Sequence, residues 1–336
     1  MLMAFRRLAS TVLWLVGLIA TAAGAGEGQF RDVSLIDVPP VDISLIDVRG
    51  EIAVEDRRQP YRLLAPSTGK GLPIVLFSHG AYSSNDLYDP ILKPWAAAGF
   101  IVIAPTHADS VSMGTPRGGQ NPKFFDWRLA DMETLVQDLE RILREAGLSD
   151  RAQTSRLAVT GHSFGGLVAQ TLAGASYRDP HTGEPVYRRE TRVAGAVIIS
   201  GAGLLPGLVT AADLAALQMP LLITVGTDDL AQMPGLSGYA WRREVFDLAG
   251  SERRLLLVQD GADHYLGGQV GRQDLPRSPY AADYLQDFLR LSILHLRSWL
   301  RDDPAVQEQL SELLQADAAL SLSRGRIERP HAKSNP

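Results

Sequence analysis

The sequence predicts an α/β fold, in which a mostly parallel central sheet is flanked by helices and preceded by an N-terminal β arm. Three observations lead to this prediction. Short β-branched apolar runs alternate with segments of helical periodicity along most of the 336 residues, which is typical of parallel strands joined by helices. Glycine-rich turns follow several of the apolar runs. One of these turns, at residues 161–166, joins a strand directly to a helix and carries a serine between glycines.

The composition bounds the class of protein. Hydrophobic residues make up 45% of the chain and charged residues 21%, which suits a globular protein that buries a sizeable core. The net charge of −5 offers no broad basic surface, so we expect no nucleic-acid partner. The sequence contains no cysteine, which excludes a cysteine nucleophile, thiolate metal sites and disulfides.

Residues 1–25 are expected to be a signal peptide. Arg6 and Arg7 precede an apolar run over residues 8–23, and small residues follow it at the predicted cleavage site. An uncleaved membrane anchor is the alternative, because the apolar run is close to spanning length. We therefore expect an exported protein, periplasmic or secreted.

Residues 26–60 are expected to form a β-rich arm. Residues 32–38 and 42–48 are a near-repeat interrupted by prolines, which predicts two edge strands or an extended arm.

A catalytic domain is expected over residues 61–302. Within it the patterns predict strands at 61–66, 73–78, 100–105, 157–160, 193–199, 220–225 and 254–258, and helices at 87–98, 127–146, 167–173, 239–250 and 280–300. Residues 176–192 are expected to be an insertion loop, and Arg128 and Asp131 are spaced for a pair on one helix. Residues 303–336 are expected to form a short helix and then, from residue 321, a disordered tail.

The turn Gly161-His162-Ser163-Phe164-Gly165 has the pattern of a nucleophile elbow. The glycines permit a turn so sharp that the Ser163 hydroxyl is exposed at the carboxyl end of a strand. The Phe164 amide then begins a helix and points to where an oxyanion forms.

A second amide donor is expected in the loop after the strand at 73–78. The sequence there is His79-Gly80-Ala81-Tyr82, and the candidate donor is the amide of Ala81, with Tyr82 as the alternative. His79 itself is interpreted as a packed structural residue.

Elimination selects the base among three of the histidines that follow Ser163. His295 lies within a helix and His331 in the tail, whereas His264 follows a strand. Asp228 and Asp229 both follow the preceding strand; the spacing from its final glycine favours Asp229 as the acid, and Asp228 remains the alternative. The order serine, aspartate, histidine is that of α/β-hydrolases.

With these motifs in place, the chain resembles the α/β-hydrolase superfamily. Within it, the resemblance is to dienelactone-hydrolase-like, chlorophyllase-like and platelet-activating-factor acetylhydrolase-like serine esterases. Four segments over about residues 60–300 carry it: 77–80, 161–166, 226–229 and 261–264. One departure is the missing cysteine, since many dienelactone hydrolases use a cysteine nucleophile.

The resemblance implies the α/β-hydrolase fold and two-step acyl transfer without a metal or organic cofactor. Ser163 would be the nucleophile, His264 the base and Asp229 the orienting acid, with the Ala81 and Phe164 amides as the oxyanion hole. We therefore expect hydrolysis of small-molecule or lipid carboxylic esters, with transient contact at a lipid surface. The alternatives are a phospholipid or platelet-activating-factor-type acylhydrolase, and a non-catalytic binding protein of the same fold.

Overall fold

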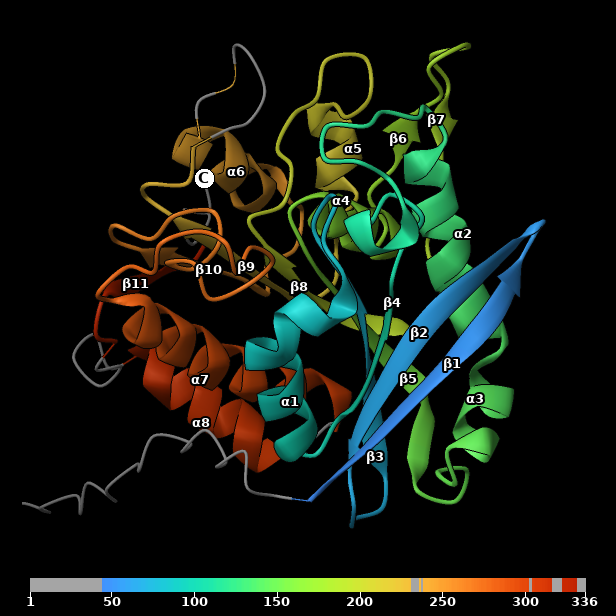
Figure 1. The fold of residues 1–336 in the computed structure, drawn as a ribbon. Coiled ribbons are helices and arrows are strands. Elements are labelled where there is room, and N and C mark those ends of the chain that lie inside the picture. The colour runs from blue at the N-terminus through green and yellow to red at the C-terminus, as the bar shows by residue number, and fades with distance from the viewer. Residues whose placement is uncertain (1–43, 231–235, 237, 302–303, 316–321, 331–336) are drawn as a thin grey trace, which may run out of the picture. The chain divides into compact units, whose positions relative to one another are not determined.

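The computed structural model describes residues 44–230, 236, 238–301, 304–315 and 322–330. Within these ranges, nine strands form one sheet in the order β1-β2-β4-β3-β5-β8-β9-β10-β11 (Figure 1). The strands are β1 Leu45–Val54, β2 Arg57–Pro66, β3 Leu72–Ser78, β4 Ile101–Pro105, β5 Ala152–His162, β8 Val193–Ile199, β9 Leu221–Gly226, β10 Arg254–Gln259 and β11 Gly325–Glu328. The run from β4 to β10 is parallel, and β1, β2 and β11 pair antiparallel at the two edges. The predicted, mostly parallel sheet is confirmed.

Helices cover both faces of the sheet. They are α1 Asp89–Ala97, α2 Phe124–Gln137, α3 Leu139–Glu145, α4 Phe164–Leu172, α5 Ala211–Ala215, α6 Gly238–Leu248, α7 Ala281–Leu300 and α8 Pro304–Gln315, with 3₁₀ turns η1 Asn85–Tyr88 and η2 Val111–Met113. Side chains of α1, α7 and α8 share one apolar cluster with the sheet, and those of α2 to α6 share the other. Successive side chains of β5 point to opposite faces of the sheet and so enter both clusters: Leu157 and Val159 face one cluster, and Ala158 faces the other. Among the described helices, none is both long and apolar enough to cross a bilayer.

The N-terminal arm is partly described. The second copy of the near-repeat contributes the start of β1, which pairs with β2 from Leu45↔Pro66 to Val54↔Arg57. The expected domain boundary at residue 60 therefore falls inside β2, and the described part of the arm is an edge of the main sheet. The first copy, at residues 32–38, lies outside the described residues, as do residues 1–25 and His331.

Three local predictions differ from the structure. The helix expected over 127–146 is two helices that meet at Asp138, a residue type that favours helix ends over interiors. Arg128 and Asp131 do not pair with each other: Arg128 pairs with Asp109, and Asp131 pairs with Arg57. The insertion loop at 176–192 contains a short hairpin of β6 Tyr177–Arg178 and β7 Pro185–Val186.

The expected disordered tail is also corrected over residues 322–330. There, β11 pairs antiparallel with β10, from Leu256↔Glu328 to Gln259↔Gly325. The buried carboxylate of Asp287 accepts hydrogen bonds from the amides of Ser323 and Arg324, at 3.1 Å each, and fixes the entry to this strand. The strand is too polar to be recognised by hydrophobic periodicity.

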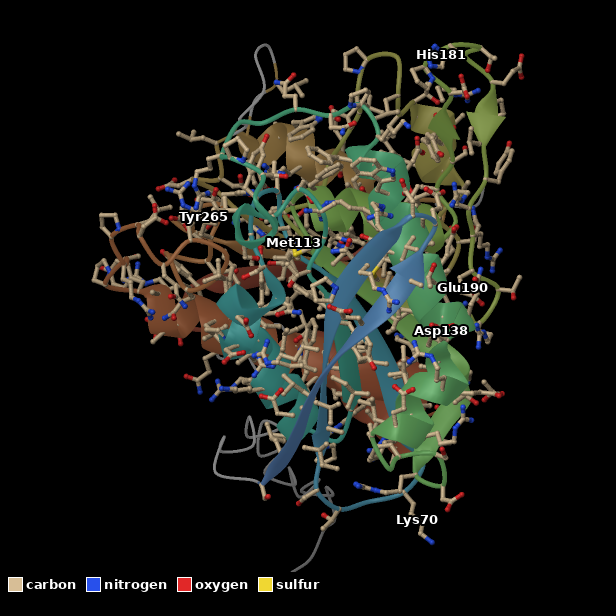
Figure 2. The ribbon with its side chains drawn as sticks, turned by 45° about the vertical axis from the view of Figure 1, so that its right-hand side comes forward. Lys70, Met113, Asp138, His181, Glu190 and Tyr265 are labelled. Atoms are coloured by element: carbon tan, nitrogen blue, oxygen red, sulfur yellow. The ribbon has the colours of Figure 1, made fainter. Side chains whose placement is uncertain are left out.

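The parallel strands of the sheet all end at the same edge, which is where ligands bind in open α/β sheets. Four of the strands, β3, β5, β9 and β10, lead into the loops that carry the predicted site residues. Figure 2 shows Tyr265 and Met113 at this end of the sheet, far from Lys70, which precedes β3 at the opposite end.

Candidate active site

Ser163 occupies a strained turn between β5 and α4. Its backbone lies at φ 56° and ψ −117°, a region that costs a non-glycine residue on the order of 1–3 kcal/mol. A Cβ on Gly161 would lie 2.1 Å from the carbonyl oxygen of Gly165, and one on Gly165 would lie 1.9 Å from that of Ser78. Both glycines are therefore required for α4 to pack against β3 and β5. The turn has the geometry expected of a nucleophile elbow, and its serine is partly exposed.

Asp229 and His264 come together from loops that follow β9 and β10. Nδ1 of His264 lies 3.1 Å from the carboxylate oxygens of Asp229. Asp229 is fully buried and His264 is 6% exposed. Asp228, the alternative acid, has an exposed side chain, and its amide donates to the carbonyl of Ala262 at 3.0 Å. Of the two aspartates, Asp229 is thus the one placed to orient the imidazole.

A buried arginine also contacts the Asp229 carboxylate. Nε of Arg242, on α6, donates to Oδ1 of Asp229 at 2.7 Å, and Nη1 donates to the carbonyls of Ser200 and Gly201 after β8. Burial opposes ionisation of Asp229, but the hydrogen bond with His264 and the charge of Arg242 outweigh it and hold the pKa of Asp229 below its ordinary value. Sequence reasoning missed Arg242, because its position on α6 carries no motif.

Burial also sets the protonation of His264. It lowers the pKa of this imidazole, and the hydrogen bond that the ring donates to Asp229 only partly opposes the effect, while Arg242 adds to it. A neutral His264 is the form that can accept a proton from a serine hydroxyl.

His162, between Gly161 and Ser163, links three loops of the site. Its Nε2 lies 2.7 Å from the carbonyl oxygen of His264, which can only accept, so Nε2 carries the proton. Burial holds the pKa of His162 well below its ordinary value, so the ring is neutral and Nδ1 accepts. The donor is the hydroxyl of Tyr88, at 2.7 Å, whose oxygen accepts from the amide of Gly80 at 3.0 Å.

The result is one continuous chain of hydrogen bonds from Gly80 through Tyr88 and His162 to His264. Its tautomers are assigned from the network. These hydrogen bonds join the loop after β3 to the turn at Ser163 and to the loop after β10. Sequence reasoning missed both Tyr88 and His162. The only available signal was the position of His162 inside the glycine-serine-glycine motif.

The loop after β3 presents two candidate amides. The amide of Tyr82 is turned toward Oδ2 of Asp109, at 3.4 Å, and Tyr82 itself has a positive φ of 62°. Within the described part of the chain, the amides of Ala81 and Phe164 donate no hydrogen bond to protein. This difference favours Ala81 over Tyr82 as the second donor.

A second serine-histidine-aspartate set lies beneath this loop. Oγ of Ser78 lies 2.9 Å from Nε2 of His107, and Nδ1 of His107 lies 2.8 Å from Oδ2 of Asp131. All three residues are fully buried, so no ester can reach the hydroxyl and the set is structural. His79 is structural too, as predicted: it is fully buried, its Nε2 accepts from the amide of His107 at 2.9 Å, and its Nδ1 donates to the carbonyl of Gly80.

Comparison with known proteins agrees with this fold. Residues 37–179 match the family model described as Chlorophyllase; they contain Ser163 and the loop after β3 but not Asp229 or His264. Chlorophyllase-1 of Citrus sinensis is 35% identical over 116 residues, which cover 34% of this chain and 32% of the relative. The platelet-activating factor acetylhydrolase of Cavia porcellus is 26% identical over 145 residues, which cover 32% of this chain and 33% of the relative. The matches therefore span about a third of the length of these relatives.

Among solved structures, a dienelactone hydrolase from Anabaena variabilis superposes with a TM-score of 0.51 at 18% identity, covering 76% of this chain and 98% of that one. At this identity the likeness shows the fold. The chain is thus an α/β-hydrolase by fold and is similar to chlorophyllases and platelet-activating factor acetylhydrolases in sequence. The resemblance inferred from the motifs is confirmed.

Proposed function

We propose that the protein is a serine hydrolase that cleaves carboxylic esters through an acyl-enzyme intermediate. The observation that carries the proposal is the 3.1 Å contact between His264 and Asp229, at the sheet edge where Ser163 occupies its strained turn. Similarity to chlorophyllases and to a platelet-activating factor acetylhydrolase supports the same class of substrate.

In the first step of the proposed reaction, His264 accepts the proton of the Ser163 hydroxyl as its oxygen attacks the ester carbonyl carbon. Asp229 orients the imidazole and stabilises the imidazolium that forms. The carbonyl oxygen becomes an oxyanion held by the amides of Phe164 and Ala81. The bond to the alkoxy group then breaks, and His264 returns its proton to the departing alcohol. Water attacks the acyl-serine by the same steps and releases the acid.

The test is hydrolysis of p-nitrophenyl acetate, butyrate, octanoate and palmitate by the wild type and by Ser163→Ala. We expect hydrolysis by the wild type and a loss on the order of 10⁴-fold or more in the variant. Activity above about a tenth of wild type in Ser163→Ala would place the nucleophile elsewhere. No hydrolysis of any ester, and no labelling of Ser163 by a fluorophosphonate, would favour the non-catalytic binding protein.

A phospholipid or platelet-activating-factor-type acylhydrolase is the second candidate, favoured by the match to the Cavia porcellus relative. Platelet-activating factor and chlorophyll therefore belong in the same assay beside the p-nitrophenyl esters. If the protein hydrolyses platelet-activating factor or chlorophyll faster than every p-nitrophenyl ester, that compound identifies the substrate class. Faster hydrolysis of the short p-nitrophenyl esters would favour a general esterase.

We further propose export of the protein, directed by residues 1–25. The basic, apolar and small-residue regions of this segment support the proposal. Cell fractionation with N-terminal sequencing of the recovered protein tests it. A mature chain that begins near residue 26 is expected, and an intact Met1 in a membrane fraction would support the anchor instead.

A further inference from the structure

Arg128 is a buried cation beneath the loop after β3. It lies in the second turn of α2 and is 1% exposed. Its Nε donates to Oδ1 of Asp109 at 2.9 Å and its Nη2 donates to Oδ2 at 2.8 Å, which is a two-point contact between the planar guanidinium and the carboxylate. Burial raises the pKa of Asp109, but the charge of Arg128 outweighs burial and brings the pKa to about 2. The two side chains therefore form a fully charged internal pair.

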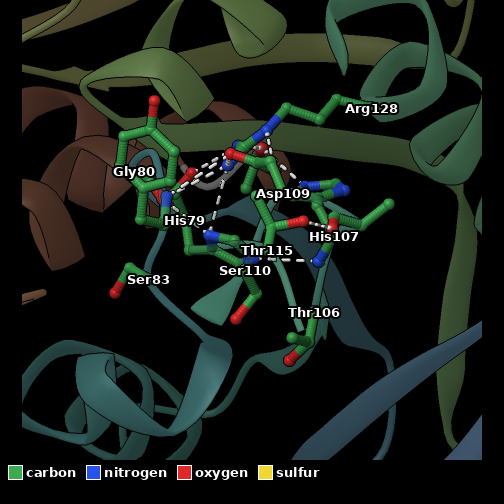
Figure 3. Close-up of polar contacts among 12 residues, drawn as sticks. His79, Gly80, Ser83, Thr106, His107, Asp109, Ser110, Thr115 and Arg128 are labelled. Atoms are coloured by element: carbon green, nitrogen blue, oxygen red, sulfur yellow. Dashed lines mark hydrogen bonds and ion pairs between the residues drawn. The ribbon is translucent and has the colours of Figure 1, made fainter. Parts of the chain in front are cut away.

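The same guanidinium holds two carbonyls of the loop. Nη1 donates to the carbonyl oxygen of His79 at 2.5 Å, and Nη2 donates to that of Gly80 at 3.2 Å (Figure 3). The Gly80 carbonyl also accepts from Nδ1 of His79 at 2.7 Å and from the amide of Ser83 at 3.2 Å. Three donors thus fix the direction of a single carbonyl group.

Fixing that carbonyl also fixes the amide of Ala81. The two groups belong to one planar trans peptide, in which C=O and N–H point in opposite directions. The Gly80 oxygen points toward Arg128, so the Ala81 N–H points away from it. As noted above, this amide has no acceptor in the described part of the chain, and it is the second donor of the proposed oxyanion hole.

Arg128 contacts the other proposed donor residue as well. Its guanidinium carbon lies 4.5 Å from the centre of the Phe164 ring, within the range of a cation–π contact. Phe164 is the first residue of α4, and its amide is the first donor of the proposed hole. One side chain therefore contacts the peptide of Ala81 and the residue that supplies the partner amide.

Asp109 completes the arrangement from the loop after β4. Its Oδ2 accepts from the amide of Tyr82 at 3.4 Å, at a residue with a positive φ that costs on the order of 1–3 kcal/mol. A strained backbone persists only where its surroundings hold it. A buried ion pair is by itself weak evidence for a stabilising role, because its desolvation cost can exceed the attraction. Here the pair also contacts the loop backbone at three residues, His79, Gly80 and Tyr82.

We infer that Arg128, oriented by Asp109, is a positioning residue that sets the direction of the Ala81 N–H in the oxyanion hole. The inference rests on the proposed function, in which Ala81 is a donor. It adds a residue that acts through the backbone and touches no substrate. Loss of the two-point contact should then weaken stabilisation of the transition state while leaving ground-state binding of the ester unchanged.

The test compares Arg128→Lys with a control substitution at an arginine whose partner lies on the same helix. Arg188→Lys is the control, because Arg188 makes a two-point contact with Glu133 of α2 and does not touch the loop. A lost oxyanion donor costs about 10²–10³-fold in kcat, and a misdirected one should cost about 10-fold or more. We expect that loss of kcat in Arg128→Lys, with KM within about threefold and a parallel loss of affinity for a boronic acid inhibitor. Arg188→Lys should retain both.

A second readout does not depend on activity. Amide hydrogen exchange over residues 79–83 should be about 10-fold faster or more in Arg128→Lys than in the wild type and in Arg188→Lys. Asp109→Asn, which keeps the shape of the carboxylate, should give the same changes if Arg128→Lys does not fold. Unchanged exchange in this segment, or an equal fall of kcat in Arg188→Lys, would overturn the inference. Wild-type protein that hydrolyses no ester would instead contradict the proposed function, and the exchange data would still decide whether Arg128 orders the loop.

Discussion

Arg242 and His264 contact the same carboxylate, that of Asp229, at 2.7 Å and 3.1 Å. The positive charge of Arg242 is therefore close to the imidazole that is proposed to accept a proton. A positive charge on His264 would be repelled by the nearby charge of Arg242, so Arg242 disfavours the imidazolium form of His264 and lowers its pKa.

This repulsion gives a prediction for the pH profile. Arg242→Gln removes the charge, so the pKa of His264 should rise and the acid limb of kcat/KM should move to higher pH, since protonated His264 cannot act as a base. Arg242→Lys, which keeps the charge, should leave the limb close to wild type. Arg242→Gln should also cost about 3–5 kcal/mol of unfolding free energy. Arg243→Gln, one residue along α6, is the control, and an unmoved limb in Arg242→Gln would refute the argument.

Replacing each of the two adjacent aspartates in turn tests which carboxylate orients His264. Asp229→Asn should lower kcat by about 10⁴-fold, because an amide cannot stabilise the correct tautomer of His264. Asp228→Asn, at an exposed side chain, should lower kcat by less than about threefold. Steady-state kinetics on a p-nitrophenyl ester measures both. The reverse order would move the acid to Asp228.

Backbone strain at Ser163 predicts a gain in stability when the side chain is removed entirely. Ser163→Ala retains a Cβ at φ 56° and should unfold near the wild-type midpoint. Ser163→Gly relieves the strain, and after the greater chain entropy of glycine is subtracted, it should be more stable than Ser163→Ala by about 1 kcal/mol. Urea denaturation of the two variants decides the matter, and equal midpoints would mean that the turn stores no strain.

The Tyr88 hydroxyl is the centre of the chain of hydrogen bonds described above. Tyr88→Phe leaves the buried Nδ1 of His162 and the amide of Gly80 without their shared partner, and each unsatisfied buried group costs about 1–3 kcal/mol. We therefore expect a loss of about 2–6 kcal/mol in unfolding free energy together with a lower kcat. Tyr187→Phe, at a side chain that is 69% exposed, should show neither effect. A fully stable Tyr88→Phe would contradict the assigned network.

Buried histidines predict how stability responds to acid. Burial lowers the pKa of five described histidines in the folded state, namely His79, His107, His162, His264 and His295. The unfolded chain therefore binds more protons as pH falls through 6.5, and the stability present above that pH is lost below it. Burial raises the pKa of Asp131 to about 6, which opposes this effect mainly below pH 6. We expect a loss of about 2–3 kcal/mol between pH 7 and pH 6 in urea titrations, and a flat profile would contradict it.

Local patterns predicted the centre of the molecule well. Strands β3, β5, β8, β9 and β10 are apolar and end at glycine-containing turns, and the elbow depends on residues within five positions of one another. The spatial pairing of Asp229 with His264 followed from topology, because parallel strands end at the same edge.

The supporting residues could not be predicted in this way. Arg242 meets Asp229 across 13 positions, Arg128 meets Asp109 across 19, and His162 meets the His264 carbonyl across 102. In the sequence, a single arginine on an amphipathic helix is expected to face solvent. Whether it is buried against a partner depends on how distant segments pack, which local patterns do not predict. The tail strand β11 was missed for a related reason, since its pairing partner β10 lies 66 or more positions away.

The position of β11 affects how the protein can be handled. It covers β10, whose Leu256 and Val258 are fully buried, and it adds the ion pair of Arg326 with Asp260 at this side of the sheet. Without residues 322–330, the backbone of an apolar parallel strand would be uncovered, and uncovered strands recruit other chains. Truncation before residue 322 would therefore convert a monomer-compatible edge into one that promotes edge-to-edge aggregation. Affinity tags and cleavage sites should be placed so that this strand remains paired.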